Sequence, residues 1–437
     1  MFPITDNQLD GALAHLGLSN LSGATIRQIV ALSEMLEQQA EDPCVHLELG
    51  NPGIPASQTG IDAECDALRK GVAGQYPNIS GIAPLKDAGS RFVKAFLDID
   101  IPGGCIIPTV GSMQGTFTNM TLLAHRDPAR DTMLFIYPGF PAQTLQAHVN
   151  GMKIRSFDLF AYRGEELERK LDEVLSAGDI TGMIYSNPNN PAWTNFTEDE
   201  LRIIGRAATK YDVVVLEDHA YMGMDYRTDL SQPGRAPFVP TVARYTDNYV
   251  LFLSASKIFS YAGQRIALAC ISPRLACRPF PALKEFFGQE SYLNAYIFGV
   301  LYCMSSGTAH SAQYALAAMM NAAVDGKLDF VHINSEYSRR AMRTKELFMR
   351  NGFNLVYERD ADGRPIGDGF FFTVRYGDMD CERLQRELMR YGIATIALNN
   401  TGSSQQGVRV CVSRIITDDH FDTLGKRLKH FDHDHRS

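Results

Sequence analysis

The chain has no excess of basic residues and no apolar run long enough to cross a membrane. Its 437 residues include 42 Lys and Arg against 50 Asp and Glu, which gives a formal net charge of −8. Nucleic-acid binding favours a basic surface, so we expect no nucleic-acid partner. The most apolar stretch, residues 292–304, is interrupted by Asn294 and is shorter than a bilayer requires, so we expect no membrane association.

Paired cysteines and a secretory signal are also missing. The eight cysteines are scattered without a Cys-x-x-Cys pair, so free and mostly buried thiols are favoured over a zinc site. The N-terminal residues lack the basic and apolar regions of a signal peptide, which predicts a cytoplasmic protein. Three histidines near the C-terminus favour a solvated terminus over a metal site, and we predict no metal: His430, His433 and His435.

Short apolar segments alternate with amphipathic ones over most of the chain. Five of them, apolar on both faces, are expected to be strands: 133–137, 180–185, 213–217, 249–254 and 266–271. Residues 164–177 show helical periodicity, and the capping box from Thr197 to Glu200 predicts the start of another helix. This alternation predicts an α/β fold with a mostly parallel sheet that has helices on both faces.

The pattern changes after about residue 325. Helices are expected at 335–350 and 381–391, and strands at 369–375 and 408–413. We therefore predict a smaller α+β domain at residues 325–437, joined by the N-terminal segment 1–56, and a large domain at residues 57–324. Ligands of open α/β sheets bind at the carboxyl ends of the strands, so the chemistry is expected there.

Two of the expected strands end in reactive side chains. Lys257 follows strand 249–254 among small residues, where desolvation would lower the pKa of its ammonium and free the amine to attack a carbonyl. A lysine pointing into solvent is the alternative. Asp218 follows strand 213–217 and could pair with a protonated pyridine nitrogen, or it could cap a turn. Tyr221 could hydrogen-bond the phenolic oxygen of the same ring.

Two further loops suggest how a phosphorylated ring would be held. The loop after strand 180–185 contains Asn190, a possible donor to a ring oxygen, although a plain turn explains its composition equally well. Gly111 to Gly115 lies between an apolar run and a helical segment, where free backbone amides could bind an anion. Ser254 and Arg265 would complete the enclosure of a phosphate monoester.

Taken together and in the order in which they follow along the chain, the motifs resemble those of the class I/II aminotransferases. These are pyridoxal-5′-phosphate (PLP) enzymes of fold type I in the aspartate aminotransferase superfamily. The matching segments are Leu49-Gly50-Asn-Pro, Tyr76-x4-Gly81-x3-Leu85, Tyr137-Pro-Gly-Phe140, Asn190-Pro191, Asp218-x-x-Tyr221, Ser254-x-x-Lys257, Arg265 and Gly407-Val-Arg409. The resemblance implies a large domain with a seven-stranded type of sheet and a homodimer with shared active sites.

The resemblance also implies a role for each residue. Lys257 would carry PLP as a Schiff base, and Asp218 and Tyr221 would complete the catalytic set. The cofactor would further contact Ser112, Met113, Gln114, Phe140, Asn190, Ser254, Arg265 and, from the neighbouring subunit, Tyr76. Gly50, Asn190 and Arg409 would bind the substrate, and Arg409 would hold its α-carboxylate.

Two departures from the family pattern bear on function. Ala192-Trp193 replaces the usual Thr-Gly after Pro191, so the loop either turns differently or extends over the site. Residues 284–310 contain no arginine for a second substrate carboxylate. We therefore predict transfer of an amino group between an L-amino acid, neutral, apolar or aromatic rather than dicarboxylic, and a 2-oxo acid. The alternatives are a PLP-dependent lyase (β-elimination or decarboxylation) and a non-catalytic PLP-binding regulator, which would need a DNA-binding module.

Overall fold

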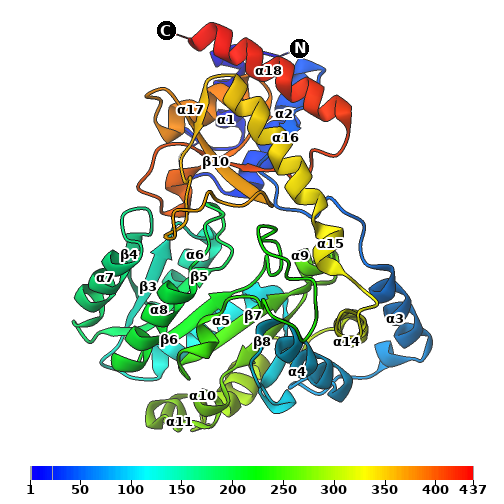
Figure 1. The fold of residues 1–437 in the computed structure, drawn as a ribbon, viewed down its shortest axis with the longest axis vertical. Coiled ribbons are helices and arrows are strands. Elements are labelled where there is room, and N and C mark those ends of the chain that lie inside the picture. Colours follow the sequence, from blue (N-terminus) through cyan, green and yellow to red (C-terminus); the bar gives the residue numbers. More distant parts are fainter. Residues whose placement is uncertain (1, 22, 437) are drawn as a thin grey trace.

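The computed structural model describes residues 2–21 and 23–436, which form two parts packed against each other (Figure 1). The larger part contains a seven-stranded sheet. The smaller part contains a four-stranded sheet and the two ends of the chain. Within the described residues, no helix is long and apolar enough to cross a membrane.

The large sheet confirms the predicted mostly parallel architecture. Its strands, in spatial order, are β2 (Ile106–Val110), β8 (Ile266–Ile271), β7 (Tyr249–Ser254), β6 (Val214–Asp218), β5 (Ile180–Ser186), β3 (Thr132–Tyr137) and β4 (Lys153–Asp158). Only β8 runs antiparallel to its neighbours. The five expected strands are confirmed to within one residue at each end, and Asp218 is the last residue of β6 instead of the residue after it.

Strand β4 was not predicted, because it lies at the edge of the sheet and its first residues are polar. Lys153 and Ser156 are exposed, so the apolar run that marks the central strands is missing.

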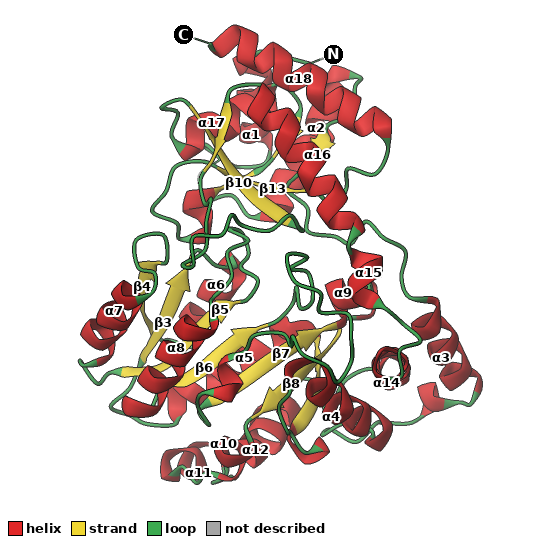
Figure 2. Ribbon diagram, in the orientation of Figure 1, coloured by secondary structure: helices red, strands yellow, loops and turns green. Residues whose placement is uncertain are grey.

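Helices cover the sheet (Figure 2). They are α3 (Gln58–Arg69), α4 (Ala83–Leu97), α5 (Gly111–His125), α6 (Pro141–Val149), α7 (Glu165–Leu175), α8 (Glu198–Lys210), α9 (Ala255–Ile258), α10 (Pro273–Cys277), α11 (Pro281–Phe287), α12 (Tyr292–Asn294), the π-helical η5 (Ala295–Leu301), α13 (Tyr302–Met304) and α14 (His310–Val324).

The predicted helices of this part are confirmed. Helix α7 buries its apolar face, which includes Leu167 and Leu171. At the start of α8, the Glu200 amide donates to the Thr197 hydroxyl at 3.2 Å, and Glu200 Oε2 accepts from the Thr197 amide at 3.0 Å. The short 3₁₀ helices of this part are η1 (Val72–Gly74), η2 (Gly103–Cys105), η3 (Val242–Arg244) and η4 (Ala262–Gln264).

The smaller part is built on an antiparallel sheet of order β12 (Ile396–Ala397), β13 (Val408–Cys411), β10 (Phe371–Tyr376) and β9 (Phe353–Leu355). Strand β1 (Val45–His46) pairs with β11 (Ile393–Ala394). The remaining elements are α1 (Asp6–His15), α2 (Ile26–Ala40), α16 (Glu336–Arg350), α17 (Cys381–Arg390), η6 (Leu398–Thr401) and α18 (Asp418–His435). The expected helices 335–350 and 381–391 and strands 369–375 and 408–413 are therefore confirmed.

Contacts at both ends of the chain tie it to the smaller part. Residues of α1 and α2 pack in one apolar cluster with Met389 and Ile396. Helix α15 (Phe330–Asn334) connects the two parts. Its first residue, Phe330, packs in the core of the larger part, and Tyr337 of the following helix α16 packs in the core of the smaller part. The domain limits at residues 56 and 325 stay predictions. The carboxyl ends of β5, β6 and β7 point toward the smaller part, and this edge is where the predicted residues meet (Figure 1).

Candidate active site

Lys257 lies in α9, the single helical turn that follows β7. Ser254 caps this turn, and its hydroxyl accepts a hydrogen bond from the Ser256 amide at 3.2 Å. Burial and the nearby cation of Arg265 together lower the pKa of the Lys257 amine to about 8, against the opposing effects of Cys411 and of the Asp218 carboxylate. The Lys257 amine has no hydrogen-bond partner among the described residues, so it is available to a ligand.

Asp218 ends β6, the strand next to β7, and is paired in register with Phe252 of that strand. Its carboxylate accepts hydrogen bonds from the Ala220 amide at 3.1 Å and from Gln143 Nε2 at 3.2 Å. Burial raises the pKa of Asp218 to about 6, although both hydrogen bonds oppose the shift. Its direct partners are neutral, so this buried carboxylate can still pair with a cation.

Arg409 projects from β13 of the smaller part and is almost fully buried. Its Nη1 donates to Asn190 Oδ1 at 3.3 Å, and its Nη2 donates to the backbone carbonyl of Glu48. The guanidinium lies 4.6 Å from the centre of the Phe371 ring. Burial lowers the pKa of Arg409, and its Nε–H has no hydrogen-bond partner among the described residues. A buried cation with a free donor is suited to a carboxylate ligand.

The segment after β2 forms a turn that lies against Arg265. Gly111 begins α5 with a positive φ of 67° and donates its amide to the Arg265 carbonyl at 3.0 Å. A Cβ at Gly111 would lie 2.5 Å from Arg265 Nη2, so only glycine allows the guanidinium to approach. The backbone amides of the first turn, including Ser112 and Met113, have no partner within the helix.

The side chain of Gln114 is engaged in fixing this turn. Its Oε1 accepts from the Val110 amide at 2.8 Å, and its Nε2 donates to Ser305 Oγ at 2.9 Å. The Met113 carbonyl likewise accepts from Gln146 Nε2 at 2.8 Å. What Met113 and Gln114 offer to an anion is therefore their backbone amides.

Of the other predicted residues, Tyr221 and Gly50 lie near the Phe371 ring, whereas Tyr76 lies at the surface. Tyr221 is buried, and its ring is 5.3 Å from that of Phe371. A Cβ at Gly50 would lie 3.8 Å from Phe371 Cζ, so Gly50 faces the same ring. Phe140 is half-buried at the start of α6. Tyr76 is 94% exposed in the loop between η1 and α4, and the structure shows no contact between it and the other predicted residues.

Trp193 occupies the position where the sequence departs from the family pattern. Its backbone takes a left-handed conformation, with φ of 60°, and its amide donates to the Asn189 carbonyl at 3.0 Å. The indole is fully buried, 5.6 Å from the Tyr221 ring and against Gly369. The loop therefore turns inward and packs between the two parts of the molecule.

A family model decides the identification. The model "Aminotransferase class I and II" matches residues 43–428, which is most of the chain. The chain belongs to the class I and II aminotransferase family. A solved structure of a Thermus thermophilus aspartate aminotransferase double mutant has the same fold, with a TM-score of 0.74 and 19% identity over 93% of this chain and 96% of that one.

Curated relatives of this family member match over shorter segments. Nicotianamine aminotransferase B of Hordeum vulgare is 27% identical over 235 residues, which cover 53% of the chain and 40% of the relative. An S-alkyl-thiohydroximate lyase of Arabidopsis thaliana is 28% identical over 176 residues, which cover 39% of the chain and 37% of the lyase. The chain thus spans less than half the length of these relatives.

Two site-lining residues of this aminotransferase-family chain escaped the sequence analysis. Gln143 holds Asp218 from α6, 75 residues away in the sequence, and no local pattern marks it. The carbonyl of Glu48 holds Arg409, while the buried Glu48 carboxylate pairs with His46 at 2.7 Å and raises the pKa of that histidine. Because Arg409 contacts the Glu48 backbone carbonyl, no side-chain pattern marks this contact in the sequence.

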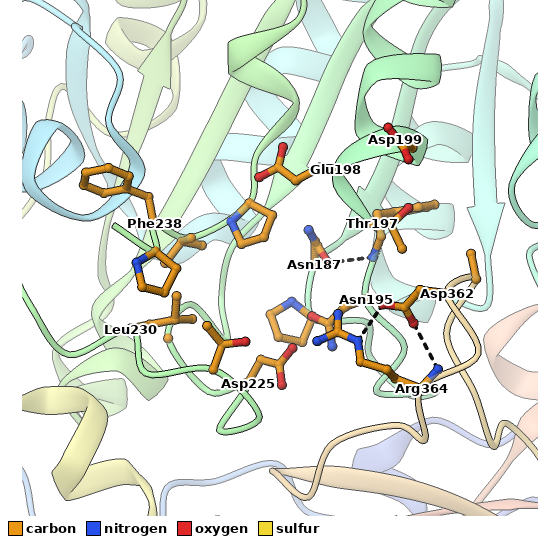
Figure 3. Close-up of a pocket in the computed structure, with 18 of the residues that line it drawn as sticks. Asn187, Asn195, Thr197, Glu198, Asp199, Asp225, Leu230, Phe238, Asp362 and Arg364 are labelled. Atoms are coloured by element: carbon orange, nitrogen blue, oxygen red, sulfur yellow. Dashed lines mark hydrogen bonds and ion pairs between the residues drawn. The ribbon is translucent and has the colours of Figure 1, made fainter. Parts of the chain in front are cut away.

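A large cavity lies beside this site instead of at it. Its volume is about 560 Å³. Loop residues form most of its lining, among them Asn187, Leu230 and Phe238 (Figure 3). No predicted site residue lines it. Its carboxylates Asp225 and Asp362 are paired with neighbouring arginines at 2.7 and 2.5 Å. We do not assign this cavity to the reaction.

Proposed function

We propose that the protein is a PLP-dependent aminotransferase that moves an amino group between an L-amino acid and a 2-oxo acid, with Lys257 as the cofactor anchor. The observation that supports this most directly is the placement of Lys257 and Asp218 at the ends of two adjacent strands. The amine has a pKa lowered to about 8, and the Asp218 carboxylate is buried with its pKa raised to about 6. When bound, PLP supplies a protonated ring that accepts electrons from the substrate Cα.

The surrounding residues fit this cofactor. Asp218 would hold the ring nitrogen protonated, and Tyr221 and Asn190 would bind the phenolic oxygen. Phe140 would cover one face of the ring. The phosphate would bind the first-turn amides of α5 (Ser112, Met113 and Gln114), Ser254 and Arg265. The close approach of Arg265 to Gly111, which a Cβ would prevent, is the feature that matches a phosphate dianion.

In the proposed mechanism, Arg409 binds the α-carboxylate of the amino acid in bidentate fashion, and Gly50 and Asn190 border the same space. This contact fixes which Cα bond stands perpendicular to the ring. Lys257, as a neutral amine, would remove the Cα proton of the substrate and later give a proton back, so it would act as base and then as acid. Asp218 stays ionised throughout and stabilises the positive ring nitrogen.

The substrate side chain is proposed to be neutral, apolar or aromatic. Residues 284–310 contain no arginine, and they place Phe298, Tyr302 and Met304 at the surface. Ser305 of the same segment accepts a hydrogen bond from Gln114, which joins the segment to the phosphate turn. A dicarboxylic substrate would leave its second carboxylate without a cationic partner there.

We further propose a homodimer in which Tyr76 of one subunit completes the phosphate site of the other. Tyr76 is almost fully exposed, and its loop lies against the segment that follows α13. His310 Nδ1 is 3.2 Å from the Gln75 carbonyl, and a Cβ at Gly307 would lie 3.6 Å from Pro77. The exposed apolar residues Tyr302 and Met304 extend this face. Apolar exposure of this kind is typical of a subunit interface.

A lyase acting through the same residues is the second candidate, because one relative is named as a lyase. A single experiment separates the two. Holoenzyme is given an amino acid alone. A transaminase releases one equivalent of 2-oxo acid per site, loses its visible absorbance band and stops, whereas a lyase turns over repeatedly. Lys257→Ala should form no such band, and the exposed-site control Lys284→Ala should behave as the wild type. A normal band in Lys257→Ala would refute the proposed anchor.

A further inference from the structure

A second cavity, of about 530 Å³, opens between the two parts of the molecule on the β4 side of the large sheet. One wall is the segment after β4, with Phe160 and Arg163. The opposite wall comes from β9, β10 and the segment after β9, and carries Arg359 and Arg375. None of the residues proposed for PLP or for the amino acid lines this cavity. Its volume is within the range of small-molecule sites.

The cavity has more positive than negative charge. The Arg375 guanidinium has no ion pair or hydrogen bond among the described residues, and the Arg359 guanidinium donates only to the Gly363 carbonyl, at 2.7 Å. Glu358 is the one carboxylate in the lining. Arg163, by contrast, is already neutralised by Glu200 at 2.8 Å. Two arginines are therefore free to bind an anion.

The lining also has an apolar part, which Phe160, Tyr357 and Leu355 contribute. Phe160 is 48% exposed, and its ring meets Tyr357 edge-on at 5.4 Å. The Tyr357 hydroxyl donates to Asp158 at 3.0 Å, which fixes the ring across the boundary between the two parts. Leu355 adds apolar surface. A ligand with a flat apolar body would lie against Phe160.

One polar group of the lining is left without a partner. Thr194 is 4% exposed, and its hydroxyl has no hydrogen-bond partner among the described residues. A buried hydroxyl without a partner is costly, and a ligand oxygen would satisfy it. Thr194 follows Trp193 directly, so the cavity begins where the inward-turning loop ends.

We propose that this cavity is a second binding site, separate from the catalytic one, for a small organic acid with one carboxylate and an aromatic or apolar body. The carboxylate binds Arg359 and Arg375, the body packs on Phe160, and a polar substituent reaches Thr194. Such a ligand touches both parts of the molecule at once.

The test uses 4-fluorobenzoate as the probe and follows its ¹⁹F resonance as it is titrated with holoenzyme. We expect saturable binding to the wild type, to Arg409→Gln and to Arg383→Gln, an exposed arginine outside the cavity. In the Arg409→Gln background, where the catalytic site no longer offers its arginine, the double variant Arg359→Gln/Arg375→Gln should bind at least about tenfold more weakly, because it loses both charge-assisted contacts. The neutral analogue 4-fluorobenzamide should also bind weakly.

Three results would overturn the proposal. The first is loss of binding in Arg409→Gln with normal binding in the double variant that keeps Arg409, which would place the probe in the catalytic site. The second is equal binding of the benzamide. The third is no saturable binding up to about 10 mM probe. An unchanged urea-unfolding midpoint shows that the double variant is folded. The result is independent of whether the protein proves to be a transaminase or a lyase.

Discussion

Arg409 and Asn190 come from different parts of the molecule, and Arg409 Nη1 donates to Asn190 Oδ1 across 3.3 Å. The first residue is proposed to hold the substrate carboxylate and the second a ring oxygen of the cofactor. Their contact therefore couples the position of the smaller part to the position of the ring. Any ligand carboxylate that binds Arg409 must fit alongside this hydrogen bond or replace it.

Arg409→Lys tests the carboxylate contact. Lysine keeps the charge but cannot form two parallel hydrogen bonds, so we expect kcat/KM for the amino acid to fall roughly 10- to 100-fold, mainly through KM. Steady-state kinetics would measure it. Arg414→Lys, an exposed arginine five residues on, serves as the control. An unchanged KM in Arg409→Lys would remove Arg409 from substrate binding.

The pH dependence of cofactor loading tests the environment of Lys257. Only the neutral amine attacks a carbonyl, so the rate at which apoenzyme regains its visible band should rise with pH through about 8. Arg265 lowers this pKa and Asp218 raises it. Arg265→Gln should therefore shift the midpoint upward, and Asp218→Asn should shift it downward, at saturating PLP. Shifts in the same direction would contradict the assignment.

Asp218→Asn also has a predicted effect on stability. The folded-state pKa of Asp218 is about 6, above its ordinary 3.8, so folded protein binds more protons than unfolded protein between these values. Stability is therefore lost as pH rises through this window, by at most about 3 kcal/mol for a shift of this size. Urea unfolding of the apoenzyme should show that Asp218→Asn is more stable than wild type at pH 8. At pH 5 this gain in the free energy of unfolding should be smaller. The exposed control Asp199→Asn should show no such difference.

The sequence predicted the central strands and the residues at their ends because both leave local patterns. Apolar runs marked β5, β6 and β7, and Lys257 and Asp218 follow from them. Strand β4 left no apolar run because it lies at the edge. Gln143 and the Glu48 carbonyl were missed because their contacts with Asp218 and Arg409 join distant segments. The inward turn of Trp193 could not be predicted either, because it depends on the space that Gly369 leaves in the distant segment before β10.

Mixed dimers test the proposed role of Tyr76. Tyr76→Phe weakens the phosphate site of the partner, and Lys257→Ala inactivates its own site, so each homodimer should be poorly active. Refolding the two variants together should restore up to about a quarter of the native sites, because one site in each heterodimer carries neither change. Activity that stays at the mean of the two homodimers would show that Tyr76 serves its own chain.

Gly369 and Trp193 provide the sharpest test of how the departing loop supports the site. A Cβ at Gly369 would lie 2.1 Å from Trp193 Cζ2, so Gly369→Ala must displace the indole or the segment before β10, at a cost of about 1–3 kcal/mol in the free energy of unfolding. The indole packs at 5.6 Å from Tyr221 and 6.1 Å from Phe371, the ring under Arg409, so the displacement should also raise KM for the amino acid.

Trp193→Ala alone should lower the free energy of unfolding by about 3–5 kcal/mol, because it leaves a large cavity. In that background Gly369→Ala should cost little, since the two residues are in contact and their effects are not additive. Equal costs of Gly369→Ala with and without the indole, measured by urea unfolding, would show that Trp193 does not occupy this space.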